Sequence, residues 1–358
     1  MDFYTDAIEP DELTGYARAA LEDQPSNAAQ LAAWLPNQTN NGLTYRTNIG
    51  AAGLLDVAEF RAFGAEPTTG RREGGAYSEG SLPPLARQYL LDEFDQYVAR
   101  DADDAEIRSA LLRDGARIAG DMSRLMEVCR ADAIFTGKVT IAEGGQGVEV
   151  DFHRPESATR VAPEAWNDPE SEVLEPLRDT LEAYRDQAGE DAGAFLLNEK
   201  IVRALVQNTE IRTYILGPNA ASAQRVRRAD VLEFLADEGV PAFYYNEARA
   251  TRLTRNAAGE VTGRATGRIT PENVIAILPA PGAQNVLGEE LGGPLGTTMW
   301  GRTLESGMPD YGLAGDEPGI VVASFIERKT PVHVNTIGSA IALPVLANPQ
   351  ATMTYQVW

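Results

Sequence analysis

The sequence predicts an α+β protein with three main parts, and three observations lead to this prediction. One apolar stripe at helical spacing runs from Asp101 to Ala133. The stretch from Leu54 to Leu90 has few apolar residues from which to build a core of its own. Helix and strand patterns then alternate from Trp166 to Pro318, before four strands close the chain. We therefore expect a long helix, an extended loop and a separate α/β segment.

The long helix is predicted over residues 101–133 because apolar side chains recur every three or four positions. Gly115 fills the one gap in a stripe made of Ile107, Leu111, Ile118, Met122, Leu125, Cys129 and Ala133. Asp101 or Asp103 can cap the first turn, and Glu106 stands where a capping-box carboxylate would. The later turns carry basic residues that suit the helix dipole, namely Arg113, Arg117, Arg124 and Arg130. At 1.5 Å per residue the helix would be roughly 45 Å long, so we expect it to act as a structural spine.

The residues before this helix predict an N-terminal arm and an extended loop. The arm is expected to hold two short helices, at Asp11–Glu22 and Ser26–Trp34, ended by Pro36. Residues 54–90 predict a two-stranded excursion with a polar, glycine-rich tip, and such an excursion must lie on another surface. A short helix at Leu85–Ala99 is expected to lead into the spine.

After the spine, strands at Thr136–Glu143 and Val148–His153 are predicted to form a hairpin around a Gly-rich turn. The α/β segment is expected to contain helices at Glu170–Gln187, Glu199–Gln207 and Ala229–Gly239, and strands at Ala194–Leu197, Ala242–Tyr245 and Val274–Leu278. Ala257–Gly267 predicts a hairpin and Pro279–Gly319 a long loop region. The closing strands are expected at Ile320–Ile326, Val332–Thr336, Ile341–Leu346 and Thr352–Val357.

Charge and composition exclude several classes of function. The net charge of −22 argues against a sequence-independent grip on nucleic acid through the overall field of the protein. Cys129 is the only cysteine, so an intrachain disulfide and a cysteine metal cluster are both impossible, and we expect a buried structural thiol. No stretch is apolar enough to span a membrane, and Met1–Asp11 lacks the pattern of a signal peptide.

The search for chemistry predicts no catalytic residue, no cofactor site and no metal site. His153 and His333 each stand without a second histidine or a cysteine nearby, which favours a structural or surface role over a metal or catalytic one. Residues 143–147 resemble a phosphate loop in their glycines alone, because the lysine and the following helix are missing. We interpret them as a hairpin turn.

Two charged clusters could also be functional. The first could bind a hard cation or act as a carboxylate pair, but we interpret its members as helix-start residues; they are Asp168, Glu170, Glu172 and Glu175. The second is a basic knot that we interpret as a solvated face or a subunit contact, formed by Arg225, Arg227 and Arg228. Serine-hydrolase elbows and zinc-protease motifs are absent from the sequence.

The order of these parts resembles the major capsid proteins of tailed bacteriophages, which have the Hong Kong 97-like fold, and within them the lambda-type major capsid protein E family. The spine helix carries the resemblance together with segments before and after it, which are Val57–Phe63 leading to Pro67, Leu82–Leu85, Glu93–Phe94, Thr136–Ile141, Val148–Phe152, Trp166–Asp168 and Ala342–Pro349. None of these motifs is catalytic. Their order and spacing along nearly the whole chain carry the resemblance.

The resemblance implies four domains: an N-terminal arm at 1–45, an extended loop at 46–92, a peripheral domain at 93–165 and 319–340 with the spine at 101–133, and an axial domain at 166–318 and 341–358. It also implies a structural protein without a catalytic step. Copies of the chain would assemble as hexamers and pentamers around double-stranded DNA, which they would not bind sequence-specifically. The same resemblance implies further partners, which are a scaffolding protein, a portal and a cementing or decoration protein. It also implies a place in the virion and assembly in the host cytoplasm, with no membrane involved.

Two departures limit what is carried over. Some relatives lock their shells with lysine-to-asparagine isopeptide bonds, but residues 54–90 contain no lysine, so non-covalent contacts or a cementing protein must provide stability. Some relatives have a long N-terminal scaffolding segment, whereas this sequence begins at its arm, which predicts a separate scaffold. Two alternatives stay open: an encapsulin-type compartment with the same fold, and a small-molecule enzyme with a cleft in residues 166–318.

Overall fold

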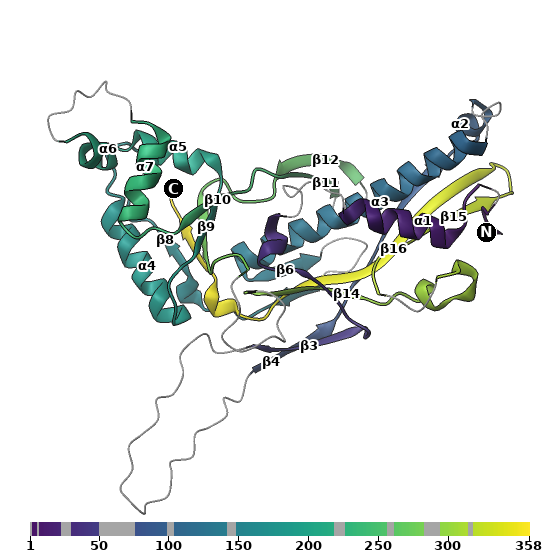
Figure 1. The fold of residues 1–358 in the computed structure, drawn as a ribbon, viewed down its shortest axis with the longest axis horizontal. Helices are drawn as coiled ribbons and strands as arrows, with labels where there is room; N and C mark the ends of the chain where they lie inside the picture. Colours follow the sequence, from purple (N-terminus) through teal and green to yellow (C-terminus); the bar gives the residue numbers. More distant parts are fainter. Residues whose placement is uncertain are drawn as a thin grey trace, which may run out of the picture. The chain divides into compact units, whose positions relative to one another are not determined.

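The computed structural model describes residues 2–5, 7–22, 30–49, 76–98, 104–141, 148–217, 226–255, 261–282, 294–313 and 318–358 (Figure 1). The chain divides into two compact units. Unit 1 consists of Met1–Arg46, Glu79–Arg130 and Thr297–Val345, and unit 2 consists of Thr47–Ser78, Ala131–Gly296 and Leu346–Trp358. Each unit is therefore assembled from three separate stretches of sequence. The assignment of the units to the named capsid domains stays a prediction.

A six-stranded sheet is the framework of unit 1. Its long strand β16 (His333–Leu346) is antiparallel to β15 (Val321–Glu327) along one edge and to β5 (Pro84–Leu91) along the other. The same sheet also contains the strands β1 (Asp2–Phe3), β14 (Gly296–Gly301) and β2 (Asn37–Thr39). The first and last parts of this unit in the sequence thus meet in one sheet.

Two helices share the core of unit 1 with this sheet. Helix α1 (Pro10–Glu22) is tied to β15, because the Thr14 hydroxyl donates to the Val322 carbonyl at 2.8 Å. Helix α3 (Asp104–Thr136) is the predicted spine. A Cβ atom at Gly115 would lie 2.9 Å from a methyl group of Leu13, so the glycine permits the close packing of α1 on α3. The shared core includes Leu13, Leu111, Ile118, Met122 and Val322.

The spine helix differs from its prediction at its C-terminal end and in the face that it buries. The structure describes the helix from Asp104, and residues 101–103, where it was expected to start, lie outside the described part of the chain. The helix continues to Thr136 with no basic residue in its last turn. The predicted dipole role of the arginines is therefore wrong. Leu125 is 36% exposed and Cys129 is half-buried rather than buried, whereas Met126 is buried. A helix of 3.6 residues per turn moves the buried face away from a strict i, i+7 series.

A five-stranded sheet organises unit 2, in the order β10-β9-β13-β17-β8. Strands β9 and β10 are parallel, and β13 and β17 are antiparallel. Their bounds are β8 Thr159–Val161, β9 Ala194–Leu197, β10 Ala242–Tyr245, β13 Val274–Leu278 and β17 Met353–Gln356. The buried strand residues are nearly continuous in β9 and β13 because both faces of the sheet centre are covered.

Four helices pack with this sheet into one hydrophobic core, and Figure 1 shows them grouped around it. They are α4 (Leu174–Ala188), α5 (Glu199–Gln207), α6 (Thr209–Leu216) and α7 (Arg228–Asp237). Unit 2 also contains two pairs of strands, which are β6 (Lys138–Ile141) with β7 (Val148–Asp151) and β11 (Arg249–Arg255) with β12 (Val261–Arg268). Another strand pair is formed by β3 (Thr44–Ile49) and β4 (Ala76–Ser81).

Most of the predicted elements are present. The arm helix, the hairpin after the spine, the strands of the α/β segment and the closing strands are confirmed, although the strands expected at 332–336 and 341–346 are one strand, β16. The hairpin expected at Ala257–Gly267 is larger than predicted, because its first strand is β11 (Arg249–Arg255), which lies before that range. The turns at 142–147 and 256–260 lie outside the described residues, as do residues 51–75 of the expected loop. Of the second arm helix, the structure describes a 3-10 helix at Gln30–Ala33.

Two predicted elements differ in type from the structure, and one helix was not predicted. The helix expected at Leu85–Ala99 is strand β5 followed by the short helix α2 (Glu93–Val98). Leu85 and Tyr89 are four positions apart, which suits a helix and a strand equally, and pairing with β16 decides between them. The loop expected at 279–319 contains strand β14. Helix α6 was not predicted, because Asn208 is both the C-terminal cap of α5 and the N-terminal cap of α6, so no loop separates the two helices.

Candidate assembly surfaces

Exposed apolar side chains are candidates for contacts between copies. In unit 1 the side chains of Phe94 on α2 and Leu304 are 72% and 84% exposed. Leu43, Leu90 and Met308 are also exposed. Large apolar groups in water are usually covered by a partner when they gather into a patch. Phe94 and Leu304 each stand between polar residues in the sequence, but their exposure depends on the fold and could not be predicted from that pattern.

A buried ion pair on α3 holds the N-terminal segment of unit 1. Arg130 and Glu127 are 2% and 1% exposed, and Arg130 Nη1 lies 2.9 Å from Glu127 Oε2. Glu127 Oε1 accepts a hydrogen bond from the Leu31 backbone N–H at 2.7 Å. Arg130 also donates to the side-chain oxygens of Asn37 at 2.6 Å and Thr298 at 2.8 Å. The pair therefore joins three segments that are far apart in the sequence.

Burial acts on the protonation of this pair. It raises the pKa of Glu127, while the positive charge of Arg130 and the Leu31 N–H oppose that rise. Burial also lowers the pKa of Arg130, against the attraction of Glu127. Each partner thus depends on the other to stay charged in the core. The predicted role of Arg130 as a dipole partner does not include this buried ion pair, for which its place beside Cys129 of the apolar stripe is a usable signal.

The C-terminal end of α3 is completed within unit 2 by Arg154. Gly137 ends the helix with a left-handed φ of 71°, and its N–H donates to the Ala133 carbonyl at 3.0 Å. Arg154 Nη1 then donates to the carbonyls of Ile134 and Phe135, at 3.1 Å each. Arg154 thus satisfies carbonyls that have no partner inside the helix.

Replacing Arg154 with methionine should lower the free energy of unfolding by about 1–3 kcal/mol, because the variant leaves these buried carbonyls without donors. Methionine keeps the apolar stem, which isolates the loss of the hydrogen bonds. Urea denaturation followed by circular dichroism measures the change. Arg154→Lys, which keeps a donor, should lie between the methionine variant and the wild type. A methionine variant as stable as the wild type would show that Arg154 does not support this helix end.

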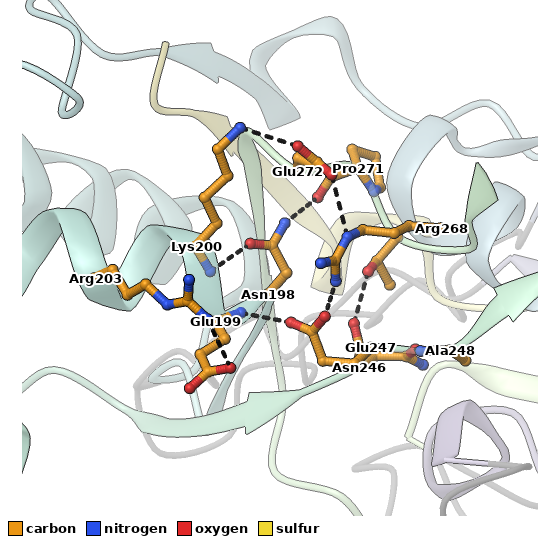
Figure 2. A network of polar contacts seen from close by, with 11 residues as sticks. Asn198, Glu199, Lys200, Arg203, Asn246, Glu247, Ala248, Arg268, Pro271 and Glu272 are labelled. Carbon is orange, nitrogen blue, oxygen red and sulfur yellow. Dashed lines mark hydrogen bonds and ion pairs between the residues drawn. The ribbon is translucent and has the colours of Figure 1, made fainter.

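In unit 2, two buried asparagines follow the parallel strands β9 and β10 (Figure 2). Asn198 Oδ1 accepts from the Lys200 backbone N–H at 2.8 Å and caps α5, while its Nδ2 donates to the Pro271 carbonyl at 3.1 Å. Asn246 Oδ1 accepts from the Ala248 N–H at 3.0 Å. In α/β enzymes, ligands bind at the carboxyl ends of parallel strands. An enzyme site in unit 2 would therefore be expected at this edge of the sheet.

The charged groups at this edge are paired with one another. Glu247 forms an ion pair with Arg268, Arg268 Nε lies 3.1 Å from Glu272 Oε1, and Glu272 Oε2 lies 3.0 Å from Lys200 Nζ (Figure 2). The hydrogen bond from Lys200 lowers the pKa of Glu272. The Lys200 ammonium also lies 5.5 Å from the ring centre of Trp358. The network fastens the base of the β11–β12 hairpin to α5 and has the form of a structural brace.

The two histidines lie in different places in the structure. The His153 side chain is 77% exposed, and the backbone N–H of the same residue donates to Asp151 Oδ1 at 2.8 Å. His333 Nε2 lies 3.1 Å from Glu327 Oε2 on the paired strand β15. Among the described residues, no three histidine, cysteine, aspartate or glutamate side chains are grouped so that they could hold a metal ion.

Three of the four acidic residues lie outside the helix whose start was predicted to explain them. Helix α4 begins at Leu174, so Asp168, Glu170 and Glu172 precede it, and Glu175 alone lies in its first turn. The N–H groups of Val173 and Leu174 instead donate to the Glu210 carboxylate, at 2.7 and 3.2 Å. Glu210 of α6, which the sequence pattern does not mark, therefore caps this helix.

The basic knot is solvated in its described part. Arg227 is exposed and pairs with Asp230 at 2.9 Å. The Arg228 guanidinium lies 4.6 Å from the ring centre of Tyr245 and 3.3 Å from Glu199. Arg225 lies outside the described residues. Among the described helices, none combines the length and apolarity that crossing a membrane requires.

Comparisons with known proteins agree with this architecture. The profile of a family described as phage major capsid protein E matches residues 50–357. A search of curated proteins gave no significant match. Among solved structures, a prophage protein of Escherichia coli CFT073 described as a capsid protein is similar, with a TM-score of 0.61 at 16% identity over 98% of this chain and 99% of that chain.

A second solved structure has the same fold. It is a phage-related protein of Bordetella bronchiseptica RB50, similar with a TM-score of 0.56 at 13% identity, over 96% of this chain and 95% of that one. At such low identities the two structures establish the fold alone. They confirm the predicted α+β capsid fold, while the family profile bears on function.

Proposed function

This chain belongs to the phage major capsid protein E family, and from that premise we propose that its copies assemble as hexamers and pentamers into an icosahedral shell around double-stranded DNA. As a major capsid protein of a tailed phage the chain has a structural role, and its place is in the virion. The observation that carries the proposal is the family match over residues 50–357 together with the capsid fold. The work of such a protein is done by its interfaces.

Three features of the chain support the proposal. Exposed apolar groups such as Phe94 and Leu304 are available for contacts between subunits. The acidic and basic side chains near the carboxyl ends of β9 and β10 form ion pairs with one another, and this arrangement does not favour a catalytic site there. The net charge of −22 suits a wall that encloses DNA without holding it tightly.

The proposed partners follow from the family and from the sequence. A separate scaffolding protein, a portal and a cementing or decoration protein would act with the shell, and assembly would take place in the host cytoplasm. Because residues 54–90 contain no lysine, the shell would be held by non-covalent contacts rather than by isopeptide bonds from this loop.

Electron microscopy and light scattering of the purified full chain, alone and with a co-expressed scaffold, test the proposal. We expect closed shells that are far larger than a single chain of 38.6 kDa, because contacts that close on themselves produce finite symmetric assemblies. Shells from infected or induced cells should contain nuclease-protected double-stranded DNA. A protein cargo without DNA would favour the encapsulin-type alternative, and a monomer under every condition would contradict the shell.

A further inference from the structure

The β11–β12 hairpin of unit 2 has strand edges and side chains that are available to bind a partner. Its strands pair with each other and, within the described residues, with no other strand. The side chains of Thr251, Arg264 and Thr266 are exposed. A lone two-stranded sheet in water is marginally stable, and one with exposed faces and edges is commonly completed by a partner.

The hairpin is also strongly basic within an acidic protein. Residues 249–268 contain five arginines and one glutamate, whereas the whole chain carries a net charge of −22. Arg268 is engaged by Glu247 and Glu272 at the base of the hairpin. Arg249 and Arg264 have no ion-pair partner among the described residues. The register Arg249↔Arg268 and Leu253↔Arg264 places both arginines on one face of the hairpin.

Helix α4 of the same unit presents the opposite charge. Its buried side holds Leu177 and Tyr184, and its other side carries exposed carboxylates at i, i+4, i+7 and i+11, which are Glu175, Asp179, Glu182 and Asp186. Residues 164–191 contain ten carboxylates and two arginines. Those arginines are engaged locally, Arg178 with Glu175 and Glu238, and Arg185 with Asp191.

We propose that the β11–β12 hairpin of one copy binds the acidic face of α4 on the next copy. The inference rests on the proposed self-assembly and names a pair of surfaces for it. The hairpin and α4 lie at separate places in unit 2 (Figure 1), so one copy can offer both to different neighbours. Two different patches that meet between successive copies form a head-to-tail contact, which closes into a ring when the rotation permits. Charge complementarity selects this contact among copies that otherwise repel each other.

Charge swaps in the full-length chain test the contact. R249E/R264E and D179K/E182K should each lower the yield of shells on the order of tenfold, because either change places like charges across the interface. The combined four-residue variant should regain most of the yield. R328E/K329E, at exposed positions of unit 1, makes the same change in net charge as the hairpin variant and should assemble normally. Circular dichroism verifies that each variant is folded.

A cross-link reports on the contact independently of shell formation. In a Cys129→Ser background, chains with R264C are mixed with chains with E182C and treated with a short bis-maleimide reagent. A mixed cross-linked dimer is expected, together with little product from either variant alone. Its absence from the oligomers that the chain forms would overturn the inference, whether or not closed shells are present.

The remaining outcomes separate the two proposals. Normal shells from both charge-swap variants would overturn the contact and leave the shell function standing. Normal shells from R249E/R264E that retain less nuclease-protected DNA would assign the hairpin to DNA instead. A wild-type chain that never forms shells would contradict the proposed function, while the cross-link still decides whether hairpin and α4 meet between copies.

Discussion

Replacing Arg130 with methionine is expected to lower the free energy of unfolding of unit 1 by about 3–5 kcal/mol, because the change leaves a charged carboxylate buried without its counter-ion. Glu127 is 1% exposed, and in the variant its carboxylate would still accept the hydrogen bond from the Leu31 N–H. Asn37 and Thr298 would each lose a donor as well. Chemical denaturation of the full chain measures the loss, and the yield of assembled shells should fall with it.

The effect of Arg130→Met should grow as the pH rises from 5 to 8. Burial already raises the pKa of Glu127, and removal of the guanidinium takes away a cause that lowers it. A carboxyl group with a raised pKa in the folded state binds more protons than in the unfolded state, so stability falls as the pH rises. The double variant E127Q/R130M carries no buried charge and should recover most of the stability without that pH dependence. A flat pH profile for the single variant would contradict this account.

Gly338→Val is expected to destabilise unit 1 by about 3 kcal/mol or more through overpacking. A Cβ atom at Gly338 on β16 would overlap the Cγ2 methyl group of Ile118 on α3, with Met122 and Val322 also close by. Ile118 is fully buried, so its methyl group has no free space to enter. Thermal unfolding and soluble yield measure the loss.

A double-mutant cycle distinguishes overpacking from a general intolerance of β16 to substitution. Ile118→Ala alone should cost about 2–5 kcal/mol because it opens a cavity. G338A/I118A should be more stable than the sum of the single changes predicts, by about 0.5–3 kcal/mol. Gly15→Ala on α1, where a Cβ atom meets nothing within 4 Å, is the matched control and should be neutral or slightly stabilising. Strict additivity of Gly338→Ala and Ile118→Ala would contradict the overlap.

Long periodic elements could be predicted from the sequence because their patterns are averaged over many residues. The stripe on α3, the alternation in β6 and β7 and the apolar runs of β9 and β13 all led to the correct type of element. The order of these elements then pointed to the capsid fold, which no single motif could do. Gly115 is a gap in the predicted stripe, and the structure shows that it is where Leu13 packs.

Features that depend on distant partners could not be predicted in this way. Strand β5 has a pattern compatible with a helix and becomes a strand because β16 pairs with it across more than 240 positions of sequence. The roles of Glu127 and Arg130 depend on Leu31, Asn37 and Thr298, which neither helical period nor propensity connects to them. Glu210 caps α4 from another helix, whereas Asp168, Glu170 and Glu172, which are closer in sequence, lie outside the helix.

The construction of each unit from three separated stretches also constrains when the protein can fold as it leaves the ribosome. The hydrogen bond from Thr14 to Val322 cannot form until Val322, which is 308 positions further along the chain, has been synthesised. In unit 2, β17 lies between β13 and β8 and is synthesised after both of them. Neither sheet can therefore be completed until almost all of these residues have been translated. A half-made chain consequently lacks both complete sheets, so synthesis itself delays the assembly of properly folded subunits until the last strands have been made.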